Sequence, residues 1–291
     1  MNATKRPPIP EPTKRLVRQR CGFGCVICGF PIYEYDHIVN YANTRSHQGD
    51  GIALLCGEHH DLKTKGLLTV ADVKEANAEP MNLRGGESRL YNLGFKANDY
   101  VFDLGTVQFS GPLTAEGAAA DPIRIDGSSV IGARVEDGQL LMSLVFCDDS
   151  GREVFRVKEN ELRYNKAMWD VEFVGKRLKI RERARRIVLD IEFEPPNRIL
   201  VRRGRILRNG IDILVTEEWT AVLNGCQLFK QVQFKNCDVG IRIGKDSREG
   251  VAGMQVDPGP RDDWDRKAAV QWAKGLASDL LVPMEEPVAW L

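Results

Sequence analysis

The sequence predicts an α+β protein in which a small, metal-stapled N-terminal module precedes an all-β domain and a C-terminal helix. Three observations support this prediction. All four histidines and four of the seven cysteines lie within residues 21–60. From about residue 98 the chain alternates apolar and polar residues with a period of two, which is typical of antiparallel strands. Near the end, apolar residues recur every four positions, as on the packed face of a helix.

Composition narrows the class of protein. The chain has 291 residues, of which 43% are hydrophobic and 28% are charged, as in an ordinary globular protein. The length favours two domains. No apolar run approaches the roughly 18 residues that span a bilayer, and the N-terminus lacks the apolar region of a signal peptide, so we expect a cytosolic protein. In that reducing compartment, clustered cysteines indicate metal ligands or reactive thiols rather than disulfides.

The N-terminus begins with a Pro-rich segment, residues 1–12, which we expect to be a flexible tail. The first domain is predicted over residues 13–80. A basic run before its first cysteine pair suits the phosphates of a nucleic acid, although a solvated helix face is the alternative. The basic residues are Lys14, Arg15, Arg18 and Arg20.

Two short motifs share one spacing. Cys25-Val-Ile-Cys28 is a CxxC knuckle, and Cys56-Gly-Glu-His59 repeats the spacing with histidine in the fourth place. Together they offer four donors that suit tetrahedral zinc, with Zn–S near ~2.3 Å and Zn–N near ~2.0 Å. Cys21 lies close enough to replace Cys25 as a ligand. The alternative to a structural zinc site is a set of buried, inert side chains.

Three further polar residues lie around these motifs. Residues 32–39 alternate as a short strand, and residues 58–65 are predicted to form a short helix. Asp36 and His37 are neighbours on that strand, so their side chains should point to opposite faces. One of them can then coordinate a metal while the other addresses a separate atom. His60 follows the last residue of the second knuckle.

The segments CVICG, YDHIV and LLCGEHHDLKT together resemble the HNH endonucleases of the zinc-knuckle type, which have a ββα-metal fold. The resemblance covers about residues 15–66, under a quarter of the chain. It implies that His37 is the general base that deprotonates water. It also implies that Asp36 and His60 bind a catalytic divalent cation, Mg²⁺ or Mn²⁺, at a phosphate oxygen and the leaving 3′ oxygen.

This chemistry is consistent with the residue types. Imidazole is the side chain best suited to accept a proton near neutral pH. A carboxylate and one histidine leave coordination positions open for water and phosphate. Lys63, one turn after His60, lies on the same helical face and could stabilise charge on the scissile phosphate. A solvated surface lysine is the alternative for Lys63.

The sequence departs from the HNH pattern at one position. Gly51 stands where the family usually has an asparagine that fastens the catalytic loop, and Asp50 or Asn43 are candidates to take over that role. His47 lies in the polar loop NTRSHQGDG and is interpreted as a loop histidine. It can also contact substrate or metal, because loops beside active sites carry such residues.

The remaining chain is predicted to contain a linker over residues 81–97 and a β-rich domain over residues 98–260, as an antiparallel sandwich or coiled sheets. Arginines are concentrated in residues 176–208, where they form either a nucleic-acid surface or a solvated sheet face. In residues 261–291, Asp262 or Asp263 is expected to cap a helix. Its apolar stripe, which either packs on the core or docks a partner protein, is Trp264, Ala268, Trp272, Leu276 and Leu280.

The predicted function is a metal-dependent HNH endonuclease that hydrolyses DNA, with structural zinc and catalytic Mg²⁺ or Mn²⁺. The alternative is a catalytically inactive, zinc-stapled DNA-binding or adaptor protein. A third hypothesis makes the nuclease an effector of bacterial defence. In that case the β-rich domain, or a partner such as a short Argonaute, senses invading nucleic acid. The net charge of zero favours local basic patches over a protein that is basic throughout.

Overall fold

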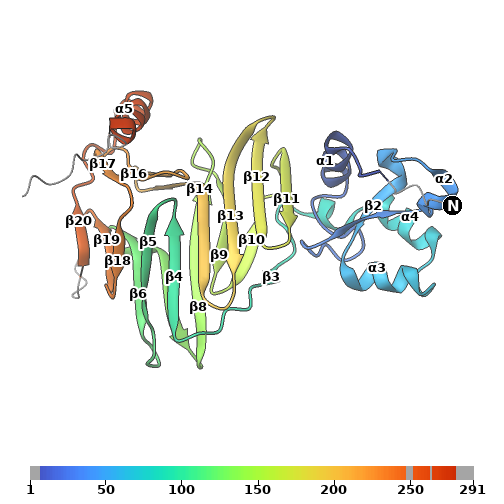
Figure 1. The fold of residues 1–291 in the computed structure, drawn as a ribbon, viewed down its shortest axis with the longest axis horizontal. Helices are drawn as coiled ribbons and strands as arrows, with labels where there is room; N and C mark the ends of the chain where they lie inside the picture. The colour runs from blue at the N-terminus through green and yellow to red at the C-terminus, as the bar shows by residue number, and fades with distance from the viewer. Residues whose placement is uncertain (1–6, 247–251, 263, 280–291) are drawn as a thin grey trace, which may run out of the picture. The chain divides into compact units, whose positions relative to one another are not determined.

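The computed structural model describes residues 7–246, 252–262 and 264–279 (Figure 1). The protein is a mixed α+β chain that is mostly β and has a C-terminal helix, as predicted. It divides into two compact units. The N-terminal unit comprises the chain up to residue 93 with residues 154–156 and 161–188, and the β unit comprises the rest. Residues 161–188, which the sequence assigns to the β-rich domain, therefore group with the N-terminal module.

The N-terminal unit contains a two-stranded antiparallel hairpin followed by a helix. Strand β1 (Glu34–His37) pairs with β2 (Ile52–Leu55), and α3 (Gly57–Thr64) follows directly. The other helices are α1 (Glu11–Arg20), α2 (Tyr41–Thr44) and α4 (Val70–Ala78), with 3₁₀ turns η1 (Gly49–Gly51) and η2 (Met81–Arg84). The remaining strands pair as β3 (Tyr91–Asn92) with β10 (Glu161–Tyr164), and β11 (Asp170–Val174) with β12 (Arg177–Arg183).

One small core holds the hairpin and helices of this unit together. Strand β2 is buried along its whole length, and its apolar side chains pack with Val17 of α1 and Val73 of α4. Helix α4 begins with a capping box between Thr69 and Asp72. The tail expected over residues 1–12 is described only from residue 7, where Ile9 packs against this core and α1 begins at Glu11.

The β unit consists of strands joined partly by hairpins and partly by longer connections. They are β4 (Asp99–Leu104), β5 (Val107–Pro112), β6 (Ala119–Ile125), β7 (Ser128–Glu136), β8 (Gln139–Cys147), β14 (Arg198–Arg208), β15 (Ile211–Val215), β16 (Thr220–Val222), β17 (Gln227–Phe229), β18 (Gln233–Lys235), β19 (Val239–Ile243) and β20 (Ala252–Val256). Strands β9 (Glu153–Lys158) and β13 (Arg186–Glu194) contribute residues to both units.

Two-residue turns set the antiparallel pairs. Asn209-Gly210 joins β14 to β15 and Asp137-Gly138 joins β7 to β8, with positive φ at both positions of each turn. This conformation matches the twist of a hairpin and favours Asn or Asp before Gly. In the part of the chain that the structure describes, four pairs are instead parallel, namely β4 with β14, β5 with β18, β6 with β19, and β19 with β20. The β unit is therefore not the purely antiparallel sheet that the alternation indicates.

The core of the β unit requires glycine where aromatic rings lie against the backbone. The rings of Phe109 and Phe234 stack with centroids 5.0 Å apart. A Cβ on Gly240 would lie 2.4 Å from Cδ1 of Phe109, which is closer than atoms can approach. Gly240 therefore allows β19 to pass over the ring.

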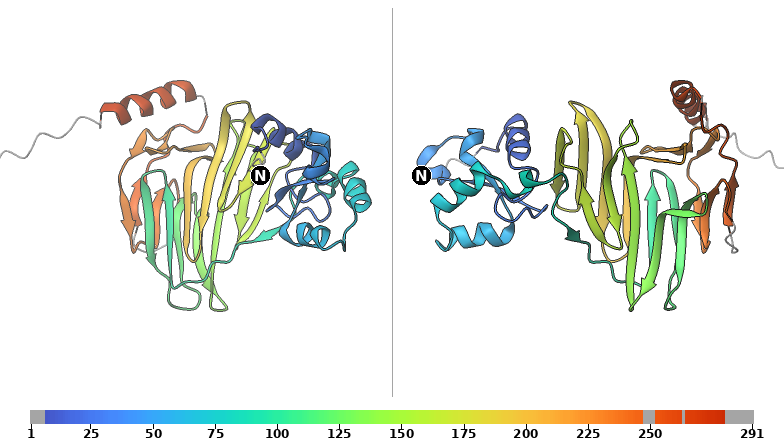
Figure 2. Two further views of the ribbon diagram at one scale, coloured as in Figure 1. Left: turned by 45° about the vertical axis from the view of Figure 1, so that its right-hand side comes forward. Right: turned by 180° about the vertical axis from the view of Figure 1, so that it is seen from behind.

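Helix α5 (Arg266–Asp279) packs on strands β16 and β17 and lies beside the C-terminal strands in both views of Figure 2. Its buried residues are Ala273 and Ala277, whereas Ala268 and Leu276 of the predicted stripe are exposed. Asp265 accepts a hydrogen bond from the Ala268 N–H, so it caps the helix in place of Asp262. The other expected cap, Asp263, and Leu280 lie outside the described residues. Among the described residues, no helix has the length and apolar character needed to cross a membrane.

Candidate metal centre and active site

Four side chains from the two knuckles converge at one point. Cys25 and Cys28 lie in the loop after α1, Cys56 precedes α3, and His59 is in the first turn of α3. Their ligand atoms all lie within 4.8 Å of one another. The Sγ atoms of Cys28 and Cys56 are 3.8 Å apart, which is about the separation of two sulfurs on one tetrahedral zinc. The cluster is thus compatible with a structural metal such as zinc.

The structure selects Cys25 over Cys21 for this cluster. Cys25 Sγ lies 3.7 Å from Nδ1 of His59, and the same nitrogen is 3.1 Å from Sγ of Cys56. Cys21 is fully buried, and its sulfur instead contacts Oδ1 of Asn77 at 3.7 Å.

Backbone hydrogen bonds and a buried asparagine shape the first knuckle. The Gly29 N–H donates to the Cys25 carbonyl, and the Cys25 N–H donates to the Phe30 carbonyl. Gly29 has φ +74°, and a Cβ there would lie 2.5 Å from Oδ1 of Asn82. The amide of Asn82, in η2, also donates to the Gly22 carbonyl. Residues after α4 therefore brace the knuckle.

The thiols of the cluster have perturbed acidities. The hydrogen bond from Cys28 lowers the pKa of Cys25, and the same bond raises the pKa of Cys28. Burial raises the pKa of the Cys56 thiol. Zinc binds thiolates, so metal binding at this cluster would release protons from these sulfurs.

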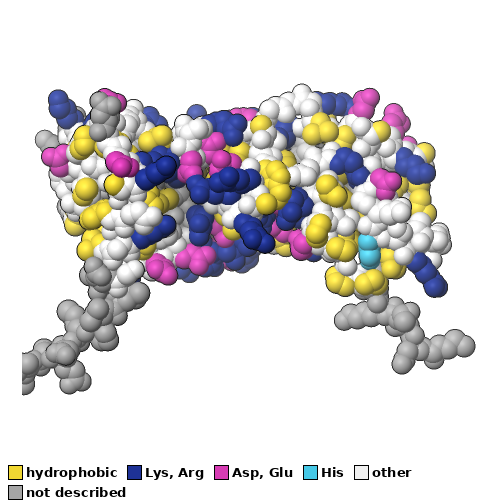
Figure 3. Space-filling view, turned by 90° about the horizontal axis from the view of Figure 1, so that it is seen from above, with side chains coloured by type: hydrophobic (Ala, Val, Ile, Leu, Met, Phe, Trp, Pro, Cys, Tyr) yellow, Lys and Arg dark blue, Asp and Glu magenta, His cyan; other side chains and the backbone are white. Residues whose placement is uncertain are grey.

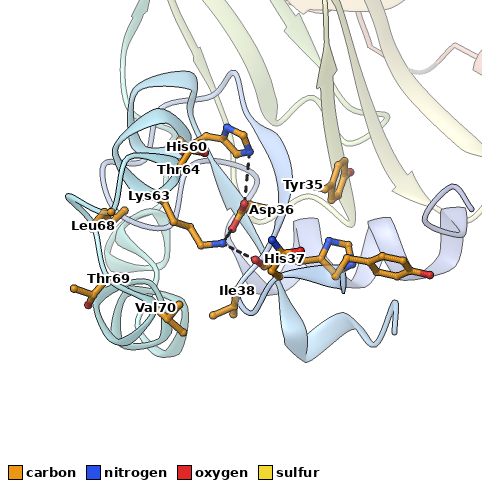
Figure 4. A pocket seen from close by; sticks show the side chains of 13 residues that line it. Tyr35, Asp36, His37, Ile38, His60, Lys63, Thr64, Leu68, Thr69 and Val70 are labelled. Carbon is orange, nitrogen blue, oxygen red and sulfur yellow. Dashed lines mark hydrogen bonds and ion pairs between the residues drawn. The ribbon is translucent and has the colours of Figure 1, made fainter. Parts of the chain in front are cut away.

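A separate set of polar residues lines a cavity of about 560 Å³ between β1, α3 and the start of α4. Asp36 lies between His60 and Lys63, as Figure 4 shows. Oδ1 of Asp36 is 3.6 Å from Nε2 of His60, and Oδ2 accepts a hydrogen bond from the Lys63 ammonium. The Lys63 ammonium also donates to the carbonyl of His37. All four residues proposed from the sequence therefore line one cavity.

Asp36 and His37 have different partners, as their neighbouring positions on β1 predict. Asp36 contacts α3, whereas Nε2 of His37 lies 3.2 Å from Nδ1 of His47. Tyr41 in α2 covers these two rings, with its centroid 5.2 Å from that of His37 and 4.8 Å from that of His47. The sequence shows His47 as a loop histidine near the motif but does not indicate its contact with His37. Nothing in the sequence points to the contact of Tyr41 with these two histidines.

Arg20 fastens the loop that precedes β2. Its guanidinium donates to the carbonyls of Gly49, at 2.7 Å, and of Ile52. The backbone N–H of Ile38 donates to the Gly51 carbonyl at 3.0 Å. Among the described residues, Asp50 and Asn43 make no side-chain hydrogen bond to this loop. Arg20 therefore fastens this loop, whereas the side chains of Asp50 and Asn43, the two candidates from the sequence, do not.

The basic residues of α1 interact within the unit. Arg18 is 1% exposed and bonds the carboxylate of Asp170 with two 2.8 Å hydrogen bonds. Arg15 lies over the Trp169 ring at 4.5 Å, and Lys14 pairs with Glu11 at 2.7 Å. The expectation that this run is a phosphate-binding flank is thus wrong for Arg18 and Arg20, which the fold uses internally.

Many arginines of residues 176–208 are also paired with carboxylates. Arg205 is buried and bonds Asp212 through two nitrogens, at 2.7 and 2.6 Å. Arg202 pairs with Glu192 at 2.9 Å. The face shown in Figure 3 likewise has acidic side chains interspersed among the basic ones. Arg183, Arg185 and Arg203 are exposed.

No family model, curated protein or solved structure matches this chain. The function proposed for it therefore rests on the residues and geometry of the two neighbouring sites.

Proposed function

We propose that this protein is a metal-dependent endonuclease that hydrolyses phosphodiester bonds in DNA. The observation that supports this best is the arrangement around Asp36. A carboxylate, an imidazole and an ammonium meet at one side of a cavity that His37 also lines. In this proposal the Cys25, Cys28, Cys56 and His59 cluster holds a structural zinc that fixes the start of α3.

The donors of the cavity fit a hydrolytic divalent cation. Asp36 and His60 would hold Mg²⁺ or Mn²⁺, because Oδ1 and Nε2 face each other and both are acceptable ligands for these ions. Two protein ligands leave positions for water and a phosphate oxygen. When bound, the cation would supply charge stabilisation at the phosphate and the leaving oxygen.

The residues of this chain then have distinct tasks. His37 accepts the proton of the attacking water, since it lines the same cavity as Asp36, His60 and Lys63. Lys63 fixes the orientation of the carboxylate of Asp36 and, through the carbonyl of His37, the end of β1. This positioning task replaces the direct phosphate contact expected for Lys63, because the Lys63 side chain is only 14% exposed and its ammonium is already bonded.

Cleavage of supercoiled plasmid by the purified protein, with Mg²⁺, Mn²⁺ or EDTA, tests the proposal. We expect nicking with the cations and none with EDTA. His37→Ala should abolish nicking while zinc content and DNA binding stay at wild-type levels, because His37 is assigned to proton transfer. Asp36→Ala and His60→Ala should instead raise the cation concentration needed for half-maximal rate.

Full activity in His37→Ala would contradict the assignment of the base. Binding of DNA without cleavage under every cation condition would favour the alternative, an inactive zinc-stapled adaptor. RNA of matched sequence in the same assay determines whether the substrate is restricted to DNA.

A further inference from the structure

We infer that His47 is a positioning residue that holds the imidazole of His37 in a single tautomer, with the proton on Nε2. The inference deepens the proposed function, since it rests on His37 as the base of that reaction. It follows from a chain of contacts that runs from the N-terminal segment through the loop after β1 to the cavity.

The hydrogen-bonding partners determine where each proton lies. Nε2 of His47 is 3.0 Å from the carbonyl oxygen of Pro7, and a carbonyl can only accept. Nε2 of His47 therefore carries a proton, and Nδ1 of the neutral ring is an acceptor. That Nδ1 lies 3.2 Å from Nε2 of His37, so His37 must donate from Nε2.

This tautomer determines which ring nitrogen of His37 can accept a proton. A neutral imidazole with its proton on Nε2 has its basic lone pair on Nδ1. The general base of the proposed reaction is thus Nδ1 of His37. The opposite tautomer would place a proton on Nδ1, and the ring could not accept one there from water.

Packing restricts the two rings to this arrangement. His37 is 7% exposed, so its ring has little freedom to turn. The ring of Tyr41 stacks on His47 at an interplanar angle of 21° and meets the ring of His37 edge-on at 76°. Helix α2, which begins at Tyr41, is capped by the side chain of Asn40. The short helix thereby places the aromatic ring that covers the pair.

Two amide substitutions separate the contacts of His47. In His47→Asn, the amide oxygen is the same number of bonds from Cα as Nδ1, so it can still accept from His37. In His47→Gln, the amide nitrogen lies near the place of Nε2 and can still donate to Pro7, but no acceptor faces His37. His47→Leu removes both contacts while it retains an apolar body against Tyr41.

Nitrogen-15 NMR of histidine-labelled protein measures the tautomer of each imidazole directly, and the measurement does not depend on whether the protein cleaves DNA. The chain has four histidines, so His37→Ala identifies the signals of His37 by difference. We expect a protonated Nε2 and an unprotonated Nδ1 in the wild type and in His47→Asn. The tautomers should be mixed in His47→Gln and His47→Leu. A wild-type His37 with its proton on Nδ1, or no change in any variant, would overturn the inference.

Cleavage kinetics form the second measurement. We expect kcat to fall roughly 10- to 100-fold in His47→Gln and His47→Leu, which is the usual effect of removing a group that orients a functional histidine. KM should stay near the wild-type value, and His47→Asn should retain most of kcat. Equal loss in all three variants would overturn the inference, because it would indicate a merely structural role.

The two measurements distinguish the inference from the proposed function. If the protein cleaves no nucleic acid, the NMR spectra still decide whether His47 sets the tautomer of His37. If cleavage occurs and depends on His37 but the tautomer is indifferent to His47, the function stands and the positioning role fails.

Discussion

Two adjacent residues of α3 serve different sites. His59 directs Nδ1 to the sulfur cluster, and His60 directs Nε2 to Asp36. Consecutive side chains on a helix are about 100° apart, so neighbouring residues can face separate environments. A metal bound at the cluster would therefore fix the first turn of α3 and, with it, the position of His60. The cluster and the cavity are coupled through this one peptide unit.

The cysteine substitutions give the first prediction. Cys28→Ser should lose the bound zinc and most of the stability of the N-terminal unit, because structural zinc supplies folding free energy to small modules. Cys21→Ser is the matched control, since Cys21 is buried nearby but lies outside the cluster. The Cys21→Ser variant should therefore retain the metal. Elemental analysis of folded, purified protein measures the zinc, and its absence from the wild type would refute the site.

A second prediction concerns the lysines of α3. Lys63→Gln should lower the maximal cleavage rate by about 10-fold or more, because hydrogen bonds to charged groups contribute ~1.5–3 kcal/mol. It should also lower the Mn²⁺ concentration needed for half-maximal rate, since one positive charge next to Asp36 is removed. Lys65→Gln, which removes a lysine that is 61% exposed and paired with Asp61, should leave both quantities unchanged. An equal effect of the two substitutions would reject the role of Lys63.

The spacing of motifs in the sequence predicts which residues belong to the two candidate sites. It does not predict which other side chains those residues contact. The paired knuckles indicate four donors, and the structure brings the same four together. The donors Asp36 and His60 are likewise adjacent to their motifs. The contact of His37 with His47 depends on the path of the loop between β1 and β2. Arg20 holds the same loop through backbone carbonyls, which leave no pattern in the sequence. Such contacts are properties of the folded backbone.

At the scale of elements, a buried ion pair holds α1 to β11. The guanidinium of Arg18 bonds Asp170 and also donates to the hydroxyl of Tyr35 in β1 at 2.7 Å. Burial lowers the pKa of Arg18, but the hydrogen bond with Asp170 and the charge interactions with Asp170 and the nearby tyrosines together outweigh it, so the net pKa is raised. Burial raises the pKa of Tyr35 to about 12, so its hydroxyl remains protonated at neutral pH. The elements α1, β1 and β11 thus meet at the side chain of Arg18.

Breaking this pair gives the third prediction. Asp170→Asn should destabilise the N-terminal unit by about 3–5 kcal/mol, because it removes the charge of the carboxylate that Arg18 bonds through two nitrogens and leaves the more distant Glu172, at 3.7 Å, beside this buried guanidinium. Lys14→Gln, which breaks the exposed pair with Glu11, should cost less than about 1 kcal/mol. Denaturant unfolding followed by tryptophan fluorescence compares them. Similar midpoints for both variants would show that the buried pair does not hold α1.

Element types were easier to predict than their pairing. Period-two alternation correctly indicates strands such as β12 and β14, and the Asn209-Gly210 dipeptide indicates a hairpin. Alternation only reports which face of a strand is buried. It carries no information on whether strands distant in the chain, such as β4 and β14, run parallel. Local periodicity also does not say to which compact unit a strand belongs, and the structure groups β11 and β12 with the N-terminal unit.

At the scale of the whole molecule, the distribution of charge limits where nucleic acid can bind. The chain has 41 basic and 41 acidic residues, and many arginines of residues 176–208 pair with carboxylates. Arg205 in particular bonds Asp212 in the interior and cannot contact a phosphate. Arg183, Arg185, Arg203 and Arg208 are exposed, and we take the first three as candidates for such contacts.

The fourth prediction tests these three arginines. Replacing them together by glutamine should weaken DNA binding modestly and flatten the dependence of log affinity on log salt, by up to about 0.9 per lost contact. Arg134→Gln is the control, since Arg134 is exposed but already paired with Glu136 and Glu159. Filter binding over a salt series measures the slopes. An unchanged slope would assign these surfaces to protein contact or signal sensing.

The discontinuity of the N-terminal unit has a consequence for synthesis. Asp170, which pairs with the buried Arg18, is translated about 150 positions after its partner, and the same unit extends to residue 188. A nascent chain that has emerged only as far as α4 contains the small core around β2 but lacks Asp170 and strands β10 to β12. Synthesis of the first five β-unit strands, β4 to β8, precedes these residues. We therefore expect the N-terminal unit to be completed late in synthesis, with Arg18 reaching its counter-ion only after β11 has emerged.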